Sequence, residues 1–90
     1  MSEQEFFGKN LVLTTEFDRY LLEHPEVAEQ IPLNAQIVLL PDDDPELSQK
    51  NREEAAAQRE PGQPVVYVHI QQLAPAVSRL VNPQISVEAA

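Results

Sequence analysis

Apolar residues early in the chain recur at the spacing of one helix face. Over residues 10–23 they fall at Leu13, Phe17, Tyr20 and Leu21. This spacing predicts an amphipathic helix. Near its start a strand is the competing interpretation, because three β-branched residues occur there: Val12, Thr14 and Thr15. Residues 1–9, which Gly8 interrupts, are expected to form a flexible leader before this helix.

A proline should divide the helical region in two. Pro25 disfavours helical backbone at the preceding residue, so the first helix is expected to end near His24. Pro25 itself suits the first position of a second, short helix over residues 25–30. Val27 and Ile31 would then face inward, and the two helices would form an N-terminal helical pair.

Two apolar runs downstream predict a pair of strands. Residues 36–40 are apolar on both faces of a pleat, which indicates a strand covered on both sides. In the second run, residues 65–70, Val66, Val68 and Ile70 share one face, and the other face carries Val65, Tyr67 and His69. A helix of about four turns would join the runs. We therefore expect a parallel, right-handed β–α–β unit.

The connecting helix has a well-marked start. Asp44 before Pro45 combines an N-cap acceptor with proline at the first helical position. The alternative is a capping box, with Asp43 at the cap and Glu46 three residues later. The helix should run to about Arg59, with its inner face formed by Leu47, Asn51, Ala55 and Gln58.

The last segment gives a weaker pattern. Leu73, Val77, Leu80 and Val81 fall at helical spacing, so a short helix over residues 75–81 is expected, with Pro83 ending it. The expected fold is therefore a small α/β (α+β) protein. It comprises a leader over residues 1–9, a single domain over residues 10–72, and a C-terminal arm over residues 73–90 that holds one short helix.

Charge narrows the classes of partner. Fifteen acidic and six basic side chains give the 90-residue chain a formal net charge of −9. Residues 1–30 hold seven acids and two bases, residues 31–60 hold seven and three, and residues 61–90 hold one of each. A protein that binds nucleic acid or an anionic membrane needs a patch of basic side chains, so neither is an expected partner.

Few residues offer reactive chemistry. The chain has no cysteine, which excludes thiol catalysis and cysteine-ligated metals. The Asp42–Asp44 triplet offers oxygen ligands to Mg²⁺ or Ca²⁺, but it lacks the spacing of a calcium loop, and capping of the next helix explains it better. His24 and His69 have no partner at a catalytic spacing. We therefore assign no catalytic, cofactor-binding or metal-binding residue and expect no enzyme and no cofactor.

Two other features indicate protein partners. A two-stranded sheet leaves both edges unpaired, and open edges favour strand addition. Asn51, expected on the inner helix face, either pairs with local backbone or forms a contact that specifies a partner. The leading hypothesis is a protein-interaction module, expected to be a homodimer. The alternative is an antitoxin-like inhibitor that covers a basic toxin. The acidic N-terminus and short apolar runs predict a cytoplasmic protein.

Several segments also resemble a known family. They are Lys9–Leu11, Glu16–Glu26, Ile37–Pro41, Asp43–Leu47 and Gly62–Val68. Together, over residues 9–85, they resemble a family of small prokaryotic proteins catalogued as a domain of unknown function. The resemblance implies a stand-alone cytoplasmic protein and an antitoxin-like role, and it supplies no catalytic residues.

Overall fold

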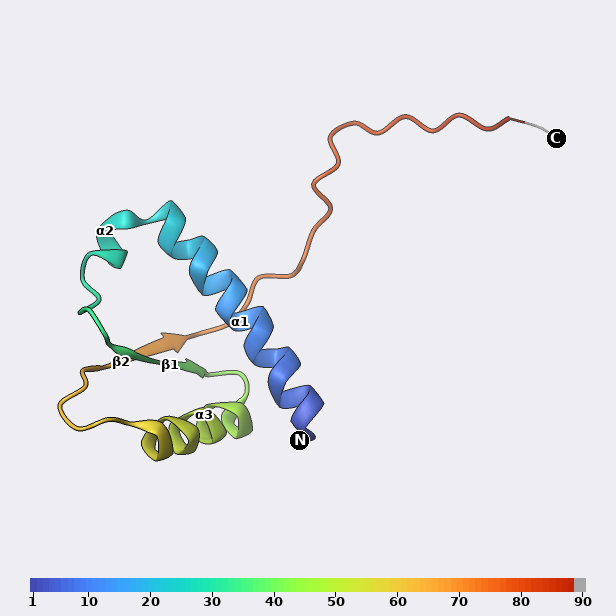
Figure 1. Cartoon of the computed structure of the whole chain (residues 1–90). Coiled ribbons are helices and arrows are strands. Elements are labelled where there is room, and N and C mark those ends of the chain that lie inside the picture. Colours follow the sequence, from blue (N-terminus) through green and yellow to red (C-terminus); the bar gives the residue numbers. More distant parts are fainter. Residues whose placement is uncertain (89–90) are drawn as a thin grey trace.

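The structure is a computed structural model that describes residues 1–88. Within that range the chain forms, in order, α1 (Glu3–Glu23), α2 (Pro25–Ala28), β1 (Gln36–Pro41), α3 (Pro45–Gln58) and β2 (Val65–Ile70). Figure 1 shows α1 and α3 on opposite sides of the two strands, with the C-terminal segment leading away from them.

The strands form the parallel pair that the apolar runs predict. β1 and β2 make a two-stranded sheet, with Gln36 beside Val65 and Pro41 beside Ile70. The backbone N–H groups of Gln36 and Asp42 donate to the carbonyls of Pro64 and Ile70, at 2.8 and 2.7 Å. The α/β (α+β) fold class, with a helical pair followed by a β–α–β unit, is confirmed.

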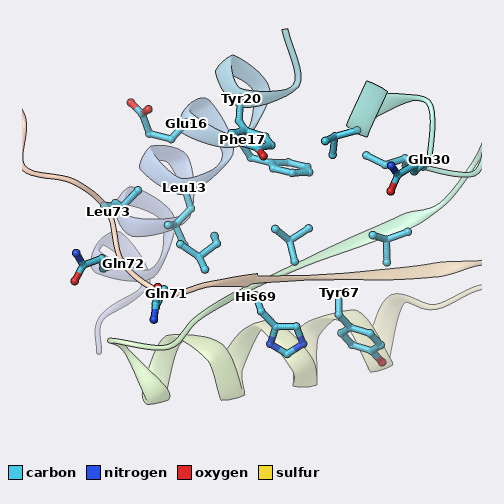
Figure 2. Close-up of a pocket in the computed structure, with 15 residues that line it drawn as sticks. Leu13, Glu16, Phe17, Tyr20, Gln30, Tyr67, His69, Gln71, Gln72 and Leu73 are labelled. Carbon is cyan, nitrogen blue, oxygen red and sulfur yellow. The ribbon is translucent and has the colours of Figure 1, made fainter. Parts of the chain in front are cut away.

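The two faces of the sheet have different covers. Tyr67 and His69 point toward α3 in Figure 2, and their β1 partners Val38 and Leu40 share that face and are buried. On the other face, Leu39 packs in one cluster with Leu13 of α1 and with Leu47. Partly buried side chains complete this cluster: Met1, Phe6, Phe17, Val68 and Ile70. The core therefore surrounds β1, and β2 lies at its margin.

The first helix begins earlier than the sequence predicts. The hydroxyl of Ser2 caps α1 by accepting from the N–H of Glu5 at 3.1 Å, and Glu3 and Glu5 place negative charge in the first turn. Phe6 packs on the core, and this burial offsets the weak helix propensity of Gly8. The prediction of a leader over residues 1–9 was wrong from Glu3 onward. The competing interpretation, a strand near residue 12, was also wrong, because these residues are helical.

The other helix boundaries lie close to the expected ones. α2 covers Pro25–Ala28, and α3 ends at Gln58, one residue before Arg59. Asp44 is the N-cap of α3, because its carboxylate accepts from the N–H of Leu47 at 3.2 Å. The capping-box alternative with Asp43 is therefore not the one that forms.

The C-terminal segment contains neither helix nor strand over residues 71–88, so the helix predicted over residues 75–81 is absent there. Val77, Leu80 and Val81 are 82%, 74% and 85% exposed, so no packing stabilises a helix over residues 75–81. A compact chain of this length has a radius of gyration of about 12 Å. The observed value is 18.1 Å, because the segment extends away from the body (Figure 1). Residues 89–90 of the predicted arm lie outside the described residues.

Asn51 joins three elements through one side chain. Its amide nitrogen donates to the carbonyl of Leu39 in β1 at 2.8 Å. It also exchanges side-chain hydrogen bonds with Asn10 of α1, at 2.9 and 3.0 Å. Asn51 therefore faces the sheet, as its place on the inner face predicts, whereas Gln58, the fourth residue of that face, is exposed.

We expect Asn51→Ala to lower the free energy of unfolding by about 1–3 kcal/mol, because it leaves polar groups of Asn10 and Leu39 without a partner. Gln49→Ala is the matched control on the same helix, since Gln49 is exposed and its side chain bonds to the equally exposed Glu53. The control should change stability by less than about 0.5 kcal/mol. Urea denaturation at one protein concentration measures both, and equal effects would contradict this role of Asn51.

Candidate functional site

An open groove of about 940 Å³ separates α1 and α2 from the outer part of the sheet. The face of β2 that carries Val66 and Val68 forms its floor, and α1 forms one wall through Phe17 and Tyr20 (Figure 2). Val27 and Ile31, in and after α2, line one end, and residues 71–73 line the other. The groove exists because α1 packs over β1 and leaves this face of β2 without a helix.

The groove is apolar inside and polar at its rim. Gln30, Gln71 and Gln72 lie at its margins (Figure 2). Glu16 lines it as well, but its carboxylate pairs with the guanidinium of Arg19 at 3.0 Å. Tyr67 and His69 point to the α3 side of the sheet. Such a lining is suited to holding apolar side chains of another segment.

The outer edge of β1 is closed, contrary to the expectation of two unpaired edges. Outward-facing carbonyls of β1 accept hydrogen bonds from α3, with Asn51 bonding Leu39 at 2.8 Å and the Ser48 hydroxyl bonding Pro41 at 2.6 Å. Pro41 also lacks an N–H group with which to bind a further strand. Strand addition at this edge would have to displace α3.

The outer edge of β2 is open. In the parallel ladder, alternate residues of β2 bond to β1, beginning at the Pro64 carbonyl and ending at the Ile70 carbonyl. The residues between them therefore direct their N–H and C=O groups away from β1: Val65, Tyr67 and His69. Among residues 1–88, no other chain segment bonds to these groups. This unpaired backbone borders the groove and, with it, forms the candidate site.

Within the acidic triplet, one residue caps a helix and also forms an ion pair. The Asp44 carboxylate caps α3 and also lies 2.8 Å from the Lys9 ammonium, whereas Asp42 and Asp43 are exposed. Within the described part of the chain, no three His, Cys, Asp or Glu side chains converge as metal ligands. The contact with Lys9 was missed from the sequence because it joins residues 35 positions apart.

The two histidines have different surroundings. The ring of His24 stacks on Tyr20 with centroids 4.0 Å apart, and its Nδ1 lies 3.0 Å from the Tyr20 carbonyl. His69 is exposed on β2, two residues from Tyr67. The guanidinium of Arg52 lies 5.4 Å from the centre of the Tyr67 ring. The sequence gives no sign of this contact, because it depends on how α3 lies across the sheet.

Comparison of the sequence with known protein families shows which family the chain belongs to. A family model described as a family of unknown function (DUF5647) matches residues 5–83. The chain belongs to this family. No curated protein and no solved structure matches it. The part that matches the DUF5647 model contains both strands, the groove and residues 71–83 of the C-terminal segment. No helix of the described residues has the length and apolarity needed to cross a membrane.

The Lys9–Asp44 pair makes a prediction for stability at the extremes of pH. The hydrogen bond from Lys9, helped by the N–H of Leu47, holds the pKa of Asp44 below its ordinary value of 3.8. The same bond raises the pKa of Lys9 above 10.5. The pair therefore stabilises the fold fully between these two values. Its contribution is lost as the pH falls through the lowered pKa of Asp44 or rises through the raised pKa of Lys9.

We expect Lys9→Gln to flatten the acid limb of the stability profile below pH 3.8 and the alkaline limb above pH 10.5. Arg59→Gln is the control, because it removes one positive charge from an exposed residue elsewhere. Urea unfolding across the pH range measures both variants. Identical profiles for the two would show that the pair has no linked effect on folding.

Proposed function

We propose that this DUF5647 protein is a small, non-enzymatic protein-interaction module of the cytoplasm that forms a homodimer through the open edge of β2. The open edge is the observation that carries the proposal. Three residues present unpaired N–H and C=O groups beside an apolar groove: Val65, Tyr67 and His69. Unpaired strand edges bind other strands readily. Neither nucleic acid nor membrane is a proposed partner.

The distribution of charge supports contact between two copies at this edge. Residues 1–60 hold fourteen acids and five bases, whereas residues 61–90 hold only Arg79 and Glu88. Two copies of an acidic protein repel one another when their charged faces meet. The near-neutral segment that contains β2 is therefore the surface on which self-association meets least repulsion.

A two-fold axis defines the register of the proposed pairing. Two antiparallel copies of β2 form a hydrogen-bonded pair only between residues whose N–H and C=O groups both face outward. Placing Tyr67 opposite its own equivalent meets this condition and sets Val65 opposite His69. The result is a continuous four-stranded sheet from two two-stranded ones, and each copy makes the same contacts.

We expect Tyr67→Pro to abolish the dimer, because proline removes the outward N–H at the centre of the pairing. That N–H is not part of the ladder with β1, so the fold should survive, as circular dichroism would show. Tyr67→Thr is the control, since it removes the ring and keeps the N–H. Sedimentation equilibrium should give dimers for the natural chain and for Tyr67→Thr, and monomers for Tyr67→Pro. A monomeric natural chain would refute the proposal.

The second candidate is an antitoxin-like inhibitor of a basic protein. It is favoured by the carboxylates exposed on α3: Glu46, Glu53 and Glu54. A basic active site could be covered by such a face through complementary charge. Co-expression with the protein encoded beside it should then relieve toxicity and give a complex that weakens as salt is added. Absence of both effects would remove this candidate.

A further inference from the structure

We propose that residues 74–88 of the C-terminal arm lie in the groove of the second copy, so that the two copies exchange arms. This inference rests on the proposed homodimer and names what fills its groove. The structure places an exposed apolar segment directly after β2. The face of β2 that carries Val66 and Val68 forms the floor of an apolar groove that no part of residues 1–88 fills. Figure 1 shows the arm leaving the body at the end of β2.

The arm is apolar and exposed. Val77, Leu80 and Val81 are 82%, 74% and 85% exposed, and Ile85 and Val87 are similarly bare. Its charged residues are Arg79 and Glu88. Such a row of apolar side chains gains free energy when an apolar surface removes it from water. The groove is a surface of that kind, since Phe17, Val27 and Val68 are among its lining residues.

The register of the dimer brings the arm to the correct end of the groove. With Tyr67 opposite its equivalent, Gln71 lies beside residue 63 of the second copy, at the start of that copy's β2. Val27 and Ile31 line this end of the groove, and Gln30 lies there in Figure 2. The arm therefore begins next to the open end of the neighbouring groove. In its own chain it begins at the opposite end, beside Leu73, and runs away from the groove.

The arm is long enough for this path. The groove follows β2 from Val66 to Ile70, a length of about 17 Å. Residues 71–81 reach at most about 36 Å when extended, so all of Val77, Leu80 and Val81 can lie over the groove.

Burial of the arm also supplies the contact area that edge pairing lacks. A stable interface buries about 1,600 Å² in total, far more than the side chains of one six-residue edge strand provide. Two arms in two grooves add apolar contact on both sides of the two-fold axis. Charge does not oppose this contact, because Glu16 of the groove pairs with Arg19.

A spin label tests the exchange directly in the full chain. The natural sequence has no cysteine, so Val77→Cys gives one site for a nitroxide. This labelled chain, without ¹⁵N, is mixed with the ¹⁵N-labelled natural chain, so that any broadening arises between copies. We expect the amide signals of Tyr20, Val27 and Val68 to broaden. A nitroxide on Ala56→Cys, on the exposed side of α3, should leave them sharp.

The outcomes separate this inference from the homodimer on which it rests. A dimeric mass without broadening at the groove overturns the arm exchange and leaves the homodimer standing. Broadening that appears only when the nitroxide and ¹⁵N are in the same chain places the arm in its own groove, and also overturns the exchange. A monomeric mass overturns both proposals.

A second variant measures how much the apolar side chains of the arm contribute to the affinity of the dimer. The triple variant Val77→Ser, Leu80→Ser, Val81→Ser should weaken dimerisation by about tenfold or more, because it removes apolar groups that are buried only in the dimer. Leu33→Ser is the matched control, since Leu33 is 95% exposed and lies outside the groove. An unchanged dissociation constant for the triple variant would overturn the inference.

Discussion

The hydrogen bond from Asn51 to the carbonyl of Leu39 is the contact on which the rest of the structure depends. It holds α3 against the outer edge of β1, and the same side chain also bonds Asn10 in the N-terminal half of α1. β1 is thereby enclosed, with Val38, Leu39 and Leu40 buried. Because both long helices pack around β1, neither covers the groove face or the outer edge of β2. The same contact that stabilises the core therefore leaves one face and one edge of β2 without a covering element.

The acidic residues and the uncovered surfaces of β2 and the arm lie in different parts of the chain. Fourteen of the fifteen acidic side chains belong to residues 1–60, and the last third is almost neutral. A chain this short buries a limited core, and an added partner surface offsets the shortfall. The strand edge, the groove and the arm all lie in or beside the neutral third. We therefore infer that they are parts of one interface.

Patterns local in sequence predicted the fold well. The apolar runs at β1 and β2, the Asp44–Pro45 start of α3 and the inward position of Asn51 all depend on neighbouring residues, and all were confirmed. The start of α1 was missed although Ser2, three residues before Glu5, is a local N-cap signal; the burial of Phe6, which offsets Gly8, is a tertiary contact. The helix expected over residues 75–81 failed for the opposite reason, since no surface buries its apolar side. The groove and the closed edge of β1 depend on how α1 and α3 lie on the sheet, which spacing alone does not encode.

Amide hydrogen exchange along β2 tests the central claim, the open edge of β2, most directly. The N–H of Val68 faces β1 and should be protected at every protein concentration, whereas that of Tyr67 faces outward. We predict fast exchange at Tyr67 in dilute protein and slower exchange as the concentration rises and a second β2 pairs with it. Exchange at Tyr67 that is as slow as at Val68 in dilute protein would contradict an open edge. Exchange that never changes with concentration would contradict pairing between two copies.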